Sequence, residues 1–251
     1  MQAHPKGIQD IDLVDRTSPI LERNHLAAAR RAILAGIFTI GLLLAYGLLR
    51  FPGVLAASPS GGRSLTGVLI VLVIYAMAGW AGPAFAGRVD PRILPAANRF
   101  GLLAGAVFAA EILLEYYLLP ADNSVMGLVE YGLVLVLFFL AGLWVAWRTQ
   151  AFRNGVMAAV WSALVSFLIW YVVVLLVFYL FFGTPQQAQV FLAEGNYADF
   201  ARSGLGDFNA FVMEDFMGAG FYHALLLPGA AVIFGTFGAA VGKALARLRK
   251  K

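Results

Sequence analysis

Five ionisable side chains lie within or beside long apolar stretches of the sequence, where ionisable residues are rare. They are Glu111, Glu115, Glu130, Asp215 and His223. A charged side chain inside a bilayer is costly, and it commonly marks an ion pathway, a proton relay or a ligand site. No Lys or Arg is expected at the same depth to neutralise the acids. We therefore take these five residues as a candidate intramembrane polar site.

Three interpretations of the acids remain open. Glu111 and Glu115 are four residues apart, so they share one face of a helix, and Glu111 falls near mid-membrane. In the first interpretation, Glu111 is protonated and donates a structural hydrogen bond between helices. In the second, the acids bind protons or cations during transport. In the third, Glu115 and Glu130 only reach the outer interface, where water solvates them.

His223 is the only histidine inside a predicted span. A haem held by two histidines needs a second one, so the sequence predicts no cofactor. Ligation of a haem or pigment by His223 alone remains as a remote alternative. We expect instead that His223 hydrogen-bonds to a Tyr, a Ser or a carboxylate.

Familiar catalytic motifs are missing from the sequence. The chain has no Cys, which excludes thiolate nucleophiles and Cys-ligated metals. Ser162 and Ser166 lack a Gly-x-Ser-Gly setting, and membrane serines usually bond to their own helix backbone. The glycine-rich segment 238–244 has the wrong spacing for a P-loop and indicates close helix packing. We therefore predict no catalytic residues, no metal and no enzymatic activity.

Transmembrane helices are the elements that must position the candidate residues. The chain is 61% hydrophobic and only 13% charged, whereas soluble domains are about half apolar and about one quarter charged. About 20 apolar residues cross a hydrocarbon core of roughly 30 Å. The prediction is an all-α polytopic bundle, in which an apparent repeat between the first and third spans suggests three helical hairpins. The six predicted spans are 32–50, 65–86, 100–119, 126–147, 155–182 and 216–242.

The basic residues predict the orientation of the bundle. If the N-terminus is cytoplasmic, all but three of the 18 Lys and Arg residues fall on the cytoplasmic side, and the exceptions are Arg50, Arg63 and Arg202. Cytoplasmic loops are enriched in Lys and Arg. We therefore expect a protein of the cell membrane with both termini in the cytoplasm and anionic lipids at its basic side.

The domain organisation follows from the same pattern. We predict a cytoplasmic tail over 1–30, with a short interfacial helix starting near Ser18, a six-span domain over 31–247 and a basic tail over 248–251. The long external segment, 183–215, should contain a helix capped by Thr184, because Thr followed by Gln three residues later forms a capping box. A further helix should begin at Asp207, and Pro228 should kink the sixth span.

Two functions from different classes fit these observations. The first is a non-enzymatic scaffold or accessory subunit that packs against other membrane proteins. The second is a small proton- or cation-linked transporter that uses the acidic cluster. The first, second and fifth predicted spans have no charged residue in their interiors, and a polar pathway normally needs polar lining. The sequence alone therefore favours the scaffold, and nothing in it indicates nucleic-acid binding.

The predicted orientation can be tested with reporter fusions. Fusions at residues 95 and 251 should report cytoplasm, and fusions at residues 58 and 200 should report the outside, because basic segments stay on the cytoplasmic side. The measurement is the activity of a reporter pair that distinguishes the two compartments. An external signal from residue 251 would show that the number of spans is not even.

Overall fold

The computed structural model describes the backbone of residues 12–56, 60–119 and 124–249, and the side chains from residue 27 onwards. All regular structure in these ranges is helical. The helices are α1 (Asp12–Arg50), α2 (Gly53–Ala56), α3 (Gly61–Val89), α4 (Ile93–Leu118), α5 (Ser124–Thr149), α6 (Phe152–Leu180), α7 (Pro185–Ala193), α8 (Asn196–Ser203) and α9 (Phe208–Leu248). Six of them, α1, α3, α4, α5, α6 and α9, are long and apolar enough to cross a membrane. The predicted all-α, six-span membrane fold is therefore confirmed.

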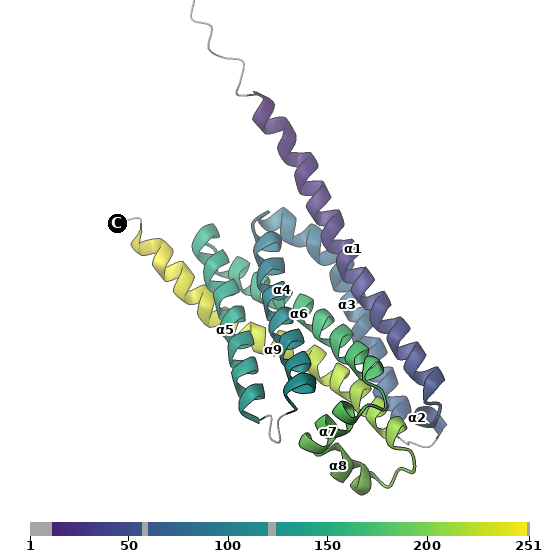
Figure 1. Cartoon of the computed structure of the whole chain (residues 1–251). Helices are drawn as coiled ribbons and strands as arrows, with labels where there is room; N and C mark the ends of the chain where they lie inside the picture. Colours follow the sequence, from purple (N-terminus) through teal and green to yellow (C-terminus); the bar gives the residue numbers. More distant parts are fainter. Residues whose placement is uncertain (1–11, 57–59, 120–123, 250–251) are drawn as a thin grey trace, which may run out of the picture.

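The central helix of the bundle is α6, which packs against α1, α4, α5 and α9 (Figure 1). It has no charged residue from Asn154 to its end, and a helix that is apolar all round is suited to burial. The start of α1 and the end of α9 lie at one end of the bundle, which we call the terminal end. The opposite end, with α2, α7 and α8, is called the α7–α8 end (Figure 1).

Two helices, α1 and α9, extend far beyond their predicted spans. The first, α1, begins at Asp12 and continues without a break through the first span, where the sequence predicted a separate helix from Ser18. The last, α9, has 41 residues and at about 1.5 Å per residue is about 60 Å long, twice the hydrocarbon core. Hydropathy predicts only the part of a helix that lipid can cover. Where the helix itself begins and ends depends on its capping residues, so a helix can be longer than its span. Residues 250 and 251 of the predicted basic tail lie outside the described residues.

Local capping explains the segment between α6 and α9. As predicted, Thr184 caps α7: its hydroxyl accepts a hydrogen bond from the backbone N–H of Gln187 at 3.3 Å. Asp207 caps the next predicted helix, but this helix is α9 itself. The sequence analysis missed α8, which lies between Gly195 and Gly204, with φ of 80° and 72°. Glycine tolerates this left-handed backbone, so the chain can end one helix and begin the next within a few residues.

Small residues hold α5 and α9 together in the terminal half of the bundle. A Cβ atom added at Gly238 or Gly242 would overlap the backbone of α5 at Phe139 or Leu143. Close backbone approach of this kind is the usual role of small residues in membrane helices. The prediction that segment 238–244 serves helix packing is confirmed.

Pro228 lies inside α9, which stays helical on both sides of it. A proline has no N–H, so the carbonyl of Ala224, four residues earlier, loses its usual helical partner. The hydroxyl of Tyr75 in α3 donates to this carbonyl at 2.9 Å, and both residues are buried. The predicted kink at Pro228 stays a prediction, but the structure shows how the freed carbonyl is satisfied.

The pairing of Tyr75 with Ala224 can be tested by a double-mutant cycle. Tyr75→Phe should lower the free energy of unfolding by about 1–3 kcal/mol, because a buried carbonyl loses its donor. In a Pro228→Ala background the restored N–H can serve the same carbonyl, so the loss should be much smaller. Thermal unfolding of the four proteins in detergent measures both effects. Equal losses in the two backgrounds would contradict the proposed link.

Candidate functional site

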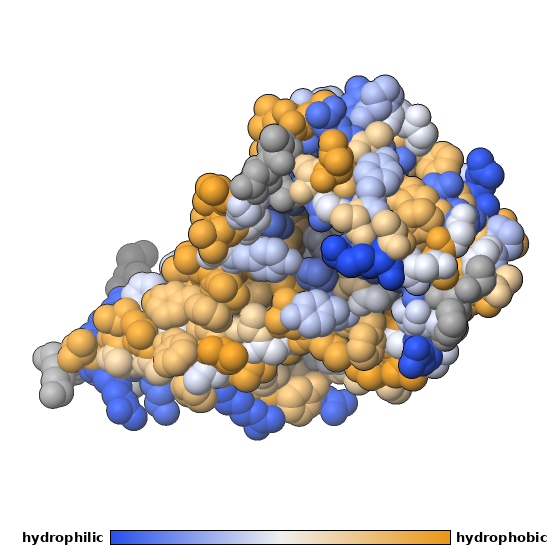
Figure 2. Space-filling view, turned by 90° about the horizontal axis from the view of Figure 1, so that it is seen from below, coloured by the Kyte–Doolittle hydropathy of each residue, from blue (hydrophilic) through white to orange (hydrophobic). Residues whose placement is uncertain are grey.

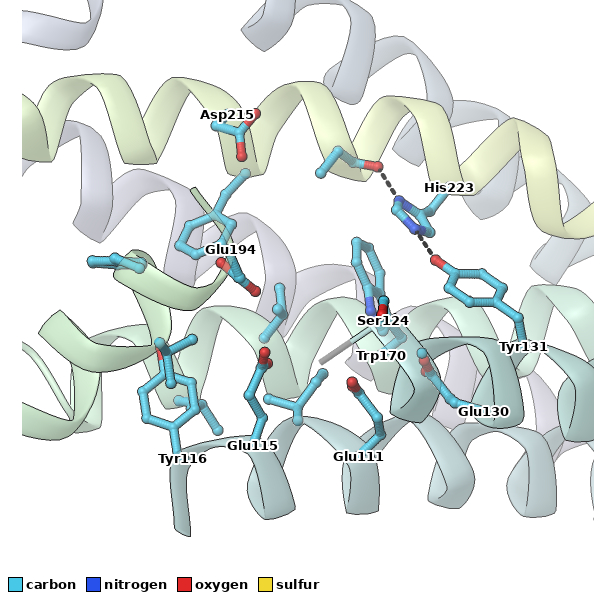
Figure 3. Close-up of a pocket in the computed structure, with 18 residues that line it drawn as sticks. Glu111, Glu115, Tyr116, Ser124, Glu130, Tyr131, Trp170, Glu194, Asp215 and His223 are labelled. Carbon is cyan, nitrogen blue, oxygen red and sulfur yellow. Dashed lines mark hydrogen bonds between the residues drawn. The ribbon is translucent and has the colours of Figure 1, made fainter. Parts of the chain in front are cut away.

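A cavity of about 350 Å³ lies between α4, α5, α6, α7 and α9, and all five residues of the predicted polar site line it. Glu111 and Glu115 come from α4, Glu130 from α5, and Asp215 and His223 from α9 (Figure 3). From the α7–α8 end, the surface is hollowed, with hydrophilic residues around the hollow and hydrophobic surface beside it (Figure 2). The tertiary structure therefore brings together residues that are more than 100 positions apart. We call this space the acidic cavity.

The acids differ in how far they are buried. Glu115 and Glu130 are only 5% and 7% exposed, whereas Glu111 is partly buried and Asp215 is exposed. This burial disfavours the interpretation in which Glu115 and Glu130 only reach the outer interface. They contact the bundle interior because α4 and α5 pack against each other and against α6.

No Lys or Arg of the described chain lines the acidic cavity, whereas five carboxyl groups do once Glu194 is included. Within the described residues, the carboxyls of Glu111, Glu130 and Asp215 form no hydrogen bond or ion pair. If Glu111 were a hydrogen-bond donor between helices, it would need an acceptor, and the described residues provide none. These oxygen atoms face the cavity instead, where water, protons or a ligand can meet them.

His223 is held by two hydrogen bonds that assign its tautomer. Its Nδ1 lies 2.9 Å from the carbonyl oxygen of Ala219, and its Nε2 lies 2.7 Å from the hydroxyl of Tyr131 (Figure 3). A carbonyl can only accept, so Nδ1 carries the hydrogen, and in the neutral ring Nε2 accepts from Tyr131. The expected hydrogen bond between His223 and a Tyr is confirmed.

Aromatic rings fix the plane of the imidazole. The ring of Trp170 stacks on His223, with 4.2 Å between centroids and 26° between planes. Tyr131 packs edge-on against Phe108 at 5.8 Å. Because the Nε2 lone pair is engaged by Tyr131, ligation of a haem or pigment by His223 would require this hydrogen bond to break.

Glu194 follows the end of α7 and lies outside the membrane-spanning helices. It is an exposed residue, but it lines the acidic cavity and is labelled there in Figure 3. Loss of water around its carboxyl, and then the negative charge of Glu115, raises the pKa of Glu194 to about 8. A hydrogen bond from the side chain of Asn196 at 3.0 Å opposes this increase.

The sequence analysis did not select Glu194, Tyr131 or Trp170. A signal for Glu194 was present, because Val190, Phe191 and Glu194 are spaced to share one helix face, and the first two are buried. Tyr131 and Trp170 had no comparable signal, since aromatic residues are common in membrane helices. Their place at the cavity depends on how α5, α6 and α9 pack.

Ser162 and Ser166 do not take part in the cavity. Both are fully buried in α6. The hydroxyl of Ser162 lies 2.8 Å from the carbonyl oxygen of Ala158 in its own helix and 2.9 Å from that of Ala97 in α4, and Ser166 donates to Ala163 at 3.0 Å. The expectation that these serines bond to their own helix backbone is confirmed for Ser166, whereas Ser162 also meets the backbone of α4.

Comparison of the chain with family models, curated proteins and solved structures gives no match. The chemical capacity of the site therefore has to be inferred from its own geometry. Carboxyls clustered in a cavity that no described Lys or Arg lines favour protons or cations, because either one relieves their mutual repulsion.

The raised pKa of Glu194 predicts a pH-dependent stability. Between about pH 4.5 and 8, the folded state keeps a proton on Glu194 that the unfolded state has lost, so this residue lowers stability as the pH rises. Glu194→Gln should therefore reduce the fall in melting temperature over this interval, measured in detergent. Asp199→Asn on α8 changes an acid that does not line the cavity and should behave like wild type. Parallel curves for wild type and Glu194→Gln would contradict the raised pKa.

Proposed function

We propose that the protein is a small, non-enzymatic transporter linked to protons or cations, with the acidic cavity as its binding site. The observation that carries this proposal is the convergence of five carboxyl groups on one cavity that no described Lys or Arg lines. Intramembrane acids are the usual means by which transporters bind protons and cations. A structural role alone gives no reason for the acids of α4, α5, α7 and α9 to face the same space.

The apolar spans no longer argue against transport. The sequence favoured a scaffold because three predicted spans lack interior charges, yet two of these, α1 and α3, contribute no residue to the acidic cavity. The third, α6, contributes Trp170, Val174 and Val177, which form an apolar wall. Polar lining is therefore concentrated in the helices that border the cavity, and the bundle as a whole can remain apolar.

The terminal half of the bundle provides the closed side that such a site requires. There α5 and α9 approach closely at Gly238 and Gly242, while Pro228 lies on α9 between these glycines and His223. Alternating access commonly uses helices interrupted near mid-membrane that move against a neighbouring helix. We propose that α9 moves relative to α5, with its proline as the weak point of the helix.

The predicted orientation completes the proposal. With both termini in the cytoplasm of a cell-membrane protein, the acidic cavity faces the outside in the observed conformation. The scaffold or accessory-subunit hypothesis remains the alternative. Exposed apolar side chains such as Phe38, Ile70 and Leu128 suit lipid and a partner helix equally, so they do not favour it.

Ion flux into proteoliposomes tests the transporter. Under an imposed inside-negative potential, wild-type protein should give a signal from an internal pH dye or an internal Na⁺ dye. Glu111→Gln combined with Glu115→Gln should lower the initial rate at least about tenfold, because the site loses two titratable groups. The double variant should keep its folding in detergent, since Gln is close to Glu in size.

A matched control removes two acids elsewhere. Asp90→Asn combined with Asp199→Asn changes carboxylates that pair with Arg92 and Arg202 and do not line the acidic cavity. It should transport like wild type. If wild-type protein carries neither ion, or if the cavity variant is as active as wild type, the transporter proposal is wrong and the scaffold is favoured.

A further inference from the structure

A second cavity, of about 580 Å³, lies at the terminal end of the bundle, between the start of α4 and the end of α5. It is on the opposite side of the membrane-spanning region from the acidic cavity, and the two share no lining residue. Its lining includes three basic side chains and several apolar ones: Arg92, Arg99, Arg148, Phe100, Trp144 and Val145. We call this space the arginine cavity.

One of its arginines is anchored by the protein. Nη1 of Arg92 donates to the backbone carbonyl of Arg148 at 2.8 Å, which links α4 to α5. Its Nε lies 3.4 Å from a carboxylate oxygen of Asp90, and Asp90 also accepts from the backbone N–H of Arg92 at 2.9 Å. This side chain therefore has an acidic partner and holds the rim of the cavity in place.

The other two arginines have no acidic partner among the described residues. Arg99 and Arg148 form no ion pair and donate no side-chain hydrogen bond there. The guanidinium of Arg148 is packed over Trp144, 4.8 Å from its ring centroid, which holds it near the cavity. The positive charge of the cavity therefore exceeds the single negative charge of Asp90. An anion would satisfy both the charge and the open N–H groups.

The position of the cavity indicates where the anion comes from. Arg148 is in the last turn of α5, and Trp144 lies one turn deeper. Tryptophan and arginine at the end of a span mark the headgroup level of a bilayer. Phe100 and Val145 give the cavity an apolar part, which suits the glycerol and first acyl carbons of a lipid but not a free ion. A soluble phosphate would gain nothing from that part of the lining.

We infer that the arginine cavity binds the phosphate headgroup of an anionic phospholipid, with Arg99 and Arg148 donating to the phosphate oxygens. Guanidinium groups match phosphate geometry with paired N–H donors, and basic pockets between transmembrane helices are typical of lipid headgroup sites. The positive end of the α4 helix dipole adds to the attraction. A bound lipid would join α4 to α5, the helices that carry three of the acids at the opposite end. The inference does not rest on the transporter proposal.

Native mass spectrometry and thermal unfolding of the purified full-length protein in detergent test this site. Phosphatidylglycerol should remain bound as a discrete adduct and raise the melting temperature, whereas phosphatidylcholine with the same acyl chains should do neither. Arg99→Gln and Arg148→Gln should each weaken phosphatidylglycerol binding about fivefold, as expected for the loss of one basic contact. Arg99→Lys and Arg148→Lys keep the charge without the guanidinium fork, so they should lie between wild type and the Gln variants.

Matched controls separate this site from general attraction to acidic lipid. Arg88→Gln and Arg247→Gln remove a charge from exposed residues near the same end of the bundle that do not line the cavity, and they should bind phosphatidylglycerol like wild type. Equal weakening in these controls and in the cavity variants would overturn the inference. Inorganic phosphate at the same concentration should not stabilise the protein, and stabilisation as large as that by phosphatidylglycerol would overturn the assignment to a lipid.

Discussion

A carboxyl group inside a membrane protein needs water, a proton or a cation, because an isolated charge loses many kcal/mol of hydration there. This requirement governs the arrangement of the whole bundle. Glu111, Glu115 and Glu130 are on spans that must pass through lipid, and no described Lys or Arg lines the cavity that they share. The bundle accommodates them by turning these residues inward to a shared cavity, away from the lipid.

The remaining helices can be apolar because the carboxyl groups, which are costly to bury, are confined to the acidic cavity. The central helix α6 separates the acidic cavity from α1, which packs on its other side, and it presents Trp170 to the cavity. Trp170 and Tyr131 in turn hold His223 in one orientation, and the carbonyl of Ala219 fixes its tautomer. A buried polar group is also satisfied at Pro228. The carbonyl of Ala224, which has no helical N–H partner there, accepts a hydrogen bond from a hydroxyl of α3.

The charges that line the two cavities are opposite in sign, and α4 and α5 contribute to both. Acids from these two helices face the acidic cavity, and arginines from the same helices line the arginine cavity. Any change in the packing of α4 against α5 would therefore affect both cavities. A lipid bound at one end and a cation bound at the other would each stabilise this helix pair, which gives the two sites a physical route for coupling.

The sequence alone determined the number of spans, because hydropathy is a local sum that needs no knowledge of packing. It also determined the helix starts after Thr184 and Asp207, since a cap depends on neighbouring residues only. The choice of Glu111, Glu130 and His223 as candidates followed from the same kind of local argument: ionisable residues are rare in apolar stretches.

Only the tertiary structure decided which of these groups meet. Position along a helix gives the depth of a residue in the membrane, but the neighbours that it faces depend on the rotation and packing of every helix. Glu194 lines the acidic cavity because α7 packs against the bundle. Tyr131 becomes a candidate site residue only once the structure places its hydroxyl beside His223. Likewise, the sequence does not distinguish Arg99 and Arg148 from other basic residues. Only the packing of α4 against α5 places them around one cavity, because a sequence gives the sign of a charge but not the direction in which its side chain points.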